Sequence, residues 1–240
     1  MNIRELFDDM WALYVRINPS VHEVRKLMEQ HEGGPVKNDH IAIRTFNHPR
    51  VNREVLAKSF LDSGYKPVED LKFEKKKLDA TYYLHDDDDL TRVFISELKL
   101  EEFSPELQET INQLINQIPN KAIEQFDFCN SGTPWNPITK ETYDFLKEES
   151  EYAAWVATFG FIVNHFTISV TDCNSFENLE QVNSFLKENG YRINDSGGEI
   201  KGSVEQGLEQ SSILAEDIIV EFDSLEYEPH DIPGCYYEFA

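Results

Sequence analysis

Two short stretches decide how this chain folds: DHIAI at residues 39–43 and NHFTI at residues 164–168. Both place a histidine near the start of an alternating apolar segment, which is typical of a β-strand. A helical pattern follows each strand and ends in a Gly-Tyr pair, within SGY at residues 63–65 and NGY at residues 189–191. The glycine lies 24 positions after the histidine in the first half and 25 in the second, which indicates an internal repeat.

Each copy of the repeat predicts a strand, a helix and three further strands, so we expect two βαβββ modules, at residues 37–102 and 159–240. Two helices at residues 1–36 precede the first module, and a helical insertion at residues 103–158 separates the two. Together these segments predict a single α+β domain, residues 1–240, in which the modules pair into one cupped sheet. The expected elements of the modules are helices at residues 50–65 and 175–191 and strands at residues 39–46, 68–73, 78–85, 92–100, 164–170, 193–195, 211–214, 218–222 and 236–239.

The chain is strongly acidic, with a formal net charge of −23 over 240 residues. It lacks the basic footprint that nucleic-acid binding requires, and an anionic membrane surface would repel it. The sequence has no run of roughly 18 apolar residues that could span a membrane, and its first 20 residues read as an amphipathic helix rather than a signal peptide. Three cysteines without a CxxC pair suit a reducing compartment, so we expect a cytoplasmic protein.

Of the seven histidines, only His40 and His165 occupy equivalent positions of the repeat. If a pseudo-twofold axis relates the modules, their first strands face each other across the cup and bring these two residues together. A single histidine at such a place is more often a hydrogen-bonded core residue. The matched pair instead favours a metal site, because imidazole is a common ligand of iron, zinc, manganese and copper.

A metal site also needs an anionic ligand, and Glu238 is the strongest candidate. It lies in the aromatic last strand, CYYEF, where a buried carboxylate is costly unless it is paired or binds a metal. Glu97, near the end of the first module, is expected to be its repeat counterpart and a possible fourth ligand, or else a surface carboxylate. Two histidines and one carboxylate form the facial triad of non-haem Fe(II) oxygenases, whereas a site that adds Glu97 is closer to that of an isomerase.

Four segments, at residues 39–46, 155–167, 209–212 and 237–239, carry a family resemblance through their order and spacing. They resemble the 2-oxoadipate dioxygenase/decarboxylase family, also called 2-hydroxyglutarate synthases. The paired βαβββ modules are similar to the wider vicinal-oxygen-chelate superfamily, which includes glyoxalases and extradiol dioxygenases. The resemblance therefore implies a vicinal-oxygen-chelate-like sheet.

The resemblance further implies that His40, His165 and Glu238 hold Fe(II). It implies a 2-oxo dicarboxylic acid, such as 2-oxoadipate, and dioxygen as the substrates. The products would be a 2-hydroxy acid and carbon dioxide, so the chain would be an oxidoreductase.

The resemblance also implies that Arg44 grips a substrate carboxylate and that Gln210, Ser211 and Ser212 form a polar strand near the substrate. Strand geometry favours Arg44 independently, because a residue four positions beyond His40 lies on the same face of the strand. A planar guanidinium can hold a carboxylate through two hydrogen bonds. The alternatives are a salt bridge from Arg44 to one of the many acidic residues and an exposed strand edge at residues 210–212.

Two other functions stay open at this point. A glyoxalase-like isomerase or hydrolase would use zinc or nickel, or manganese, with Glu97 as a fourth ligand and Glu238 as a base. A metal-free module would simply hold a small acid in the cup. Metal retention and oxygen uptake with 2-oxo acids distinguish these readings.

Overall fold

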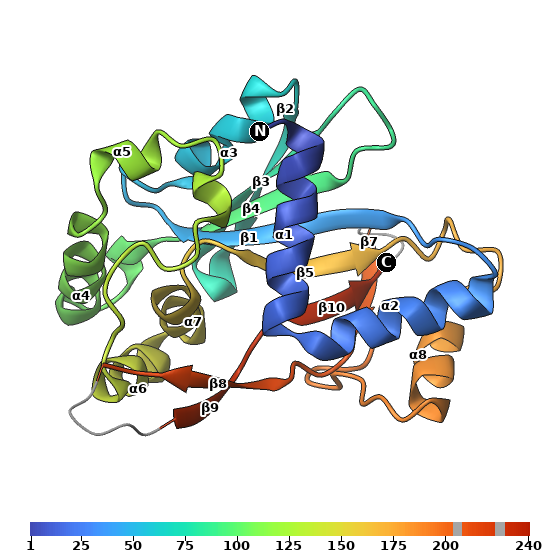
Figure 1. Ribbon diagram of the computed structural model, residues 1–240. Coiled ribbons are helices and arrows are strands. Elements are labelled where there is room, and N and C mark those ends of the chain that lie inside the picture. The colour runs from blue at the N-terminus through green and yellow to red at the C-terminus, as the bar shows by residue number, and fades with distance from the viewer. Residues whose placement is uncertain (204–207, 224–228) are drawn as a thin grey trace.

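The computed structural model describes residues 1–203, 208–223 and 229–240 and shows an α+β fold built on a curled sheet (Figure 1). Within the described residues, eight strands form this sheet in the order β2-β3-β4-β1-β5-β10-β7-β6. The order is symmetrical about its centre. The first strands of the two modules lie side by side, and the fourth, third and second strands of each module follow outward. The repeat therefore predicted the pairing of the two modules, but their first strands are hydrogen-bonded neighbours in one sheet rather than facing each other across a cup.

The elements of the first module follow the predicted order, with boundaries that differ by a few residues, and the second module follows it except between α8 and β10. The first helix, for example, begins only after Asn52, whose side chain accepts a hydrogen bond from the backbone N–H of Val55 and caps the helix. The elements are β1 (Asn38–Phe46), α3 (Arg53–Asp62), β2 (Lys66–Phe73), β3 (Leu78–Leu84), β4 (Arg92–Leu98), β5 (Val163–Ile168), α8 (Leu179–Glu188), β6 (Lys201–Ser203), β7 (Leu208–Ser212) and β10 (Tyr236–Phe239).

The ends of α3 and α8 confirm the repeat at the level of the backbone. Gly64 and Gly190 both have positive φ, at 101° and 89°. The tyrosine that follows each glycine donates its backbone N–H to the carbonyl five residues earlier, that of Phe60 in α3 and Leu186 in α8, both at 3.0 Å. This pattern is the Schellman motif, in which glycine takes the left-handed position without a Cβ penalty.

The central strand pair brings the two histidines together. β1 and β5 are antiparallel, with His40 opposite Thr167 and His165 opposite Ala42. Each histidine therefore lies opposite the residue two positions after the other, as a local twofold axis requires. β4 runs parallel to β1, and β10 runs parallel to β5.

Two N-terminal helices, α1 (Ile3–Ile17) and α2 (Pro19–Glu32), precede the sheet, and α1 crosses one of its faces in Figure 1. Trp11 and Tyr14 of α1 pack on Phe166 of β5, with ring centroids 5.0 and 4.9 Å from the phenyl ring. Because side chains alternate along a strand, this face is opposite to the one that carries the histidines.

The insertion between the modules is mostly helical, as predicted. Its last helix lies on the histidine face, because its Tyr152 hydroxyl is hydrogen-bonded to Ser96 of β4.

Within the described part of the chain, no helix has the length and apolar character needed to cross a membrane. The short helices η1 (Glu74–Lys76) and η2 (Leu100–Glu102) lie within the first module. The helices of the insertion are α4 (Pro105–Asn116), α5 (Asn120–Ile123), η3 (Phe128–Asn130), α6 (Lys140–Glu149) and α7 (Glu151–Phe159).

The second module differs from the expectation between β7 and β10. The strand predicted at residues 218–222 forms as β8 (Asp217–Glu221), but it pairs with β9 (Pro229–Pro233) in a separate two-stranded sheet. The strand predicted at residues 193–195 does not form, and Ile193 makes only an isolated bridge to Ile213. The strand that pairs with β7 at this edge of the sheet is β6. Alternating burial marks a half-buried strand but does not identify its partner.

Candidate metal centre

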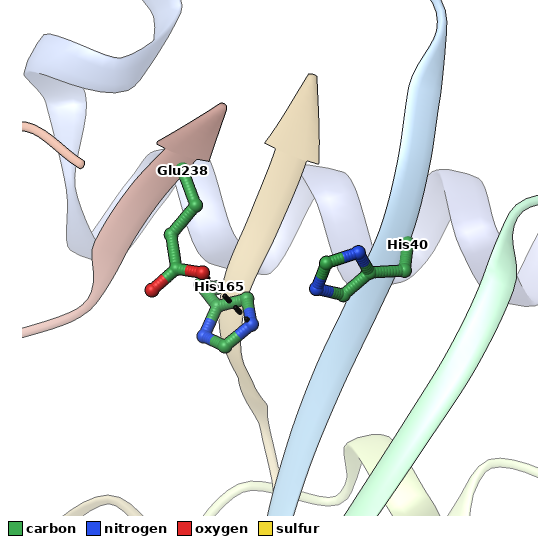
Figure 2. Close-up of side chains that lie close together, drawn as sticks. All are labelled: His40, His165 and Glu238. Atoms are coloured by element: carbon green, nitrogen blue, oxygen red, sulfur yellow. Dashed lines mark ion pairs between the residues drawn. The ribbon is translucent and has the colours of Figure 1, made fainter. Parts of the chain in front are cut away.

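Three side chains that are far apart in the sequence converge on one face of the sheet, as Figure 2 shows. His40 comes from β1, His165 from β5 and Glu238 from β10, three neighbouring strands. One donor atom of each lies within 4.8 Å of the other two. Thr167 of β5 pairs with His40 on one side and Glu238 on the other, which puts all of them on the same face. Its hydroxyl lies 3.2 Å from His40 Nε2.

The spacing suits a metal ion. Nε2 of His165 lies 3.4 Å from Oε2 of Glu238, and the two imidazole rings stand at 82° with centroids 5.5 Å apart. An ion about 2.1 Å from each donor holds neighbouring donors roughly 3 Å apart. Both His40 and Glu238 are only 8% exposed, so little water competes for their donor atoms. His40, His165 and Glu238 would hold such an ion through three donors and would leave its further coordination positions to a small-molecule ligand.

The charges of the cluster call for a cation. Burial, together with the neighbouring charges of His40 and Arg44, lowers the pKa of His165 well below its usual value, so its ring is neutral at pH 7. Burial also raises the pKa of Glu238, whose Oε2 has no hydrogen-bond donor within the described residues. Because the His165 ring is neutral, the 3.4 Å contact is not a salt bridge, and a divalent ion would satisfy the lone pairs of both atoms. The residues fit a metal.

Each histidine is oriented by the residue before it. Nδ1 of His40 lies 2.7 Å from a carboxylate oxygen of Asp39, and Nδ1 of His165 lies 3.2 Å from the amide oxygen of Asn164. An acceptor at Nδ1 leaves the Nε2 lone pair for the metal. Burial raises the pKa of Asp39, but the hydrogen bond and charge of His40, with the charge of Arg92 2.7 Å away, outweigh burial and hold that pKa below its usual value.

Glu97 lies outside the cluster, contrary to the expectation that it could be a fourth ligand. In the β1–β4 pair it is opposite Thr45, which points away from the histidine face. One of its carboxylate oxygens accepts the backbone N–H of Arg53 at 2.9 Å, and the other lies 3.5 Å from the Arg53 side chain. Glu97 therefore anchors the start of α3.

The repeat counterpart of Glu238 is Phe94 rather than Glu97. Glu238 is opposite Thr167, two residues after the histidine of β5, and Phe94 is opposite Ala42, two residues after the histidine of β1. Counting from the module ends predicted the wrong counterpart, because only the register defines equivalent positions.

Arg44 lies on the histidine face of β1, as strand geometry predicted. Its guanidinium carbon is 5.1 Å from the ring centroids of both Tyr152 and Trp155 of α7. No ion pair joins Arg44 to a carboxylate within the described residues, whereas Arg53 and Arg92 both have acidic partners. The guanidinium is therefore available to an anionic ligand near the cluster.

The polar segment at residues 210–212 contributes to both faces of the sheet. Ser212 is opposite Glu238 and shares its face, as does Gln210 two residues earlier. Ser211 is opposite Phe239, so its buried side chain points to the helix-covered face. Gln210 and Ser212, but not Ser211, therefore lie on the same face of the sheet as the candidate site.

Several residues of the site were not predicted from the sequence. Asp39 and Asn164 carried a usable signal, since an acceptor precedes the histidine in both halves. Lys201 is opposite Gln210 in β6 and so shares the site face, but its register is not visible in the sequence. Tyr152 and Trp155 lie in a helix more than 100 positions from Arg44, and no spacing pattern connects them.

Comparison with known proteins agrees with this geometry. The family model described as 2-oxoadipate dioxygenase/decarboxylase matches residues 6–240. A chloroplastic 2-oxoadipate dioxygenase/decarboxylase of Arabidopsis thaliana is 34% identical over 250 residues, which cover 99% of this chain and 67% of the plant protein.

Solved structures show the same relationship. A protein of Shewanella frigidimarina, named as a hydrolase, is 46% identical with a TM-score of 0.92, over 99% of this chain and 91% of the other. The hydroxyglutarate synthase of Oryza sativa, solved in complex with 2-oxoadipate, is 31% identical with a TM-score of 0.89, over 98% of this chain and 79% of the other. The chain with the paired histidines and Glu238 therefore belongs to the 2-oxoadipate dioxygenase/decarboxylase family.

Proposed function

We propose that this chain is an Fe(II)-dependent dioxygenase and decarboxylase of a 2-oxo dicarboxylate such as 2-oxoadipate. The reaction consumes one dioxygen and releases the first carboxylate as one carbon dioxide. One oxygen atom enters the carboxylate formed from the keto carbon, and the other becomes the hydroxyl of a 2-hydroxy acid one carbon shorter, 2-hydroxyglutarate in the case of 2-oxoadipate. The names of the matching family and of its plant members support this proposal.

The observation that carries the proposal is the two-histidine, one-carboxylate cluster with an uncommitted guanidinium on the same strand face. Fe(II) in such a triad supplies one-electron chemistry and open positions for dioxygen and a chelating 2-oxo acid. Arg44 lies four positions beyond His40 on β1, a backbone distance of about 13 Å. That distance leaves room for a substrate of several carbons between the cluster and the guanidinium.

The protein's own residues then fix the substrate at both ends. His40, His165 and Glu238 form one side of the site and direct the 2-oxo acid end toward the open side. Arg44 binds the distal carboxylate and so sets the direction in which the carbon chain lies. Gln210 and Ser212 supply polar groups on the same face of the sheet.

The test is oxygen consumption by protein loaded anaerobically with Fe(II), measured with a panel of 2-oxo acids. We expect uptake with 2-oxo dicarboxylates, one carbon dioxide released per oxygen consumed, and loss of uptake in His165→Ala. His31→Ala is the matched control, because His31, on α2, packs against Phe176 and Phe185 and lies outside the cluster. Absence of uptake with every acid would refute the dioxygenase.

A hydrolase is the second candidate, because the Shewanella relative carries that name at 46% identity. Such an enzyme would work with zinc or nickel and need no oxygen. Product formation by the zinc-loaded protein under anaerobic conditions would favour it, whereas strict dependence on Fe(II) and oxygen excludes it. Failure of the purified protein to retain any metal would leave only a small-acid binding module.

A further inference from the structure

The side chain of Arg44 is held by two aromatic rings rather than by an acid. Its guanidinium carbon lies 5.1 Å from the ring centroids of Tyr152 and Trp155, which are three residues apart on α7. Residues at this spacing lie on the same side of a helix, so the two rings form one slot. A guanidinium over an aromatic face is attracted by the ring quadrupole without using its N–H donors.

This arrangement contrasts with that of the other arginines close to the sheet. Arg53 contacts Glu97 and Asp70, and Arg92 contacts Asp39. Arg44 has no such partner within the described residues, although the chain contains 45 acidic residues. The aromatic slot therefore holds the cation while leaving its hydrogen-bond donors to a ligand.

The slot is tied to the first module through Tyr152. Its hydroxyl accepts the backbone N–H of Thr45 at 3.0 Å and donates to the carbonyl of Ser96 at 2.7 Å. The side chain of Ser96 lies 2.9 Å from the same hydroxyl. Burial raises the pKa of Tyr152 above its usual value, so the ring stays neutral and keeps these bonds.

The slot is tied to the second module through Trp155. Its indole N–H donates to the carbonyl of Gly234 at 2.9 Å, just before the strand that carries Glu238. The ring is 6% exposed, and its plane cannot turn without breaking this bond. One helix of the insertion therefore sets Arg44 in a fixed position relative to both halves of the metal centre.

We propose that Tyr152 and Trp155 are positioning residues that hold the Arg44 guanidinium toward the distal carboxylate of the substrate. This inference rests on the proposed function and assigns a role to the helical insertion: α7 takes part in substrate selection. It predicts that the slot discriminates between a 2-oxo dicarboxylate and a monocarboxylate of equal length. Loss of the slot should weaken only the binding of the dicarboxylate.

The test uses Trp155→Leu and the conservative variant Trp155→Phe. Anaerobic calorimetry of the Fe(II)-loaded proteins would give the dissociation constants of 2-oxoadipate and of 2-oxohexanoate, which lacks the distal carboxylate. We expect Trp155→Leu to raise the constant for 2-oxoadipate roughly tenfold and to leave that for 2-oxohexanoate within about twofold. Trp155→Phe, which keeps an aromatic face, should recover most of the loss. In turnover the change should fall on KM rather than kcat.

Trp135→Leu is the matched control. Trp135 is also 6% exposed and donates its indole N–H to a backbone carbonyl, that of Ala157 at 2.8 Å, but it packs on Phe161. The Trp135→Leu variant should lower the melting temperature as Trp155→Leu does, without changing the preference for the dicarboxylate.

Two results would overturn the inference: an equal loss of both ligands in Trp155→Leu, or a wild-type protein that binds both equally. Binding does not depend on turnover. A protein that discriminates through the slot but consumes no oxygen would refute the proposed function alone.

Discussion

His40 and His165 face each other across the β1–β5 pair, with ring centroids 5.5 Å apart and planes at 82°. This geometry follows from the register, in which each histidine is opposite the residue two positions after the other. A twofold relation between the modules therefore turns two ordinary strand positions into a pair of converging ligands, and Glu238 completes the set.

Loss of the Glu238 carboxylate should weaken metal binding strongly, and the chain offers a matched control. Glu238→Gln should lower the affinity for Fe(II) roughly a hundredfold or more, because the remaining oxygen is neutral. Glu97→Gln removes a carboxylate with the same 8% exposure from the opposite face, where it bonds Arg53, and should retain the metal. The iron content of each variant is measured after anaerobic loading and desalting. Equal metal loss in the two variants would contradict the assignment.

The orientation of the first histidine should depend on Asp39. Asp39→Ala removes the acceptor at Nδ1, frees the ring and should weaken metal binding roughly 10- to 100-fold. Asp39→Asn keeps an acceptor like that of Asn164 in the other half and should stay within a few-fold of the wild type. Competition with a chelator gives the affinities. An alanine variant that binds metal as tightly as the wild type would show that Asp39 does not orient the ring.

Gly160→Ala should destabilise the protein strongly. Gly160 ends α7 just before β5, has φ of 69°, and a Cβ there would lie 2.0 Å from the Gly132 carbonyl oxygen. We expect a loss of about 3 kcal/mol or more in the free energy of unfolding. Gly190→Ala has a similar positive φ but meets open space, so it should cost only about 1 kcal/mol. Denaturant unfolding measures both, and equal losses would contradict the steric explanation.

The stability that Glu32 of α2 contributes through its hydrogen bonds to the loop before α8 should depend on pH. Hydrogen bonds from Asn174 and Ser175 lower the pKa of Glu32 from 4.5 to about 2. The folded-state pKa is the lower one, so the stabilisation is full above about pH 4.5 and disappears as the pH falls toward 2. Melting temperatures should therefore separate wild type from Glu32→Gln at pH 7 and converge near pH 2. A constant difference at every pH would refute this linkage.

The sequence was sufficient for the parts of the site that depend on the repeat. His40 and His165 could be paired because both begin matching strands, and Glu238 stood out as a lone carboxylate in an aromatic strand. Arg44 followed from the alternation of side chains along β1. These inferences need only local periodicity and the symmetry between the modules.

The remaining errors come from strand register, which a single sequence does not encode. Glu97 and Ser211 both lie one position out of phase with the site, and a shift of one residue moves a side chain to the other face. The hairpin of β8 and β9 has the same alternation as a strand of the main sheet. The contacts of Tyr152 and Trp155 with Arg44 arise from tertiary packing of a distant helix.

Phe94 occupies the position in the first module that is equivalent to Glu238 in the second, which makes the candidate metal centre asymmetric. Two identical modules would offer two imidazoles and two carboxylates and would surround an ion evenly. In this chain an aromatic ring replaces the fourth donor, so protein ligands crowd toward β5 and β10 while the flank next to β4 carries none. A metal ion held here would receive no protein donor from β4, so a small molecule would meet it on the flank of the first module.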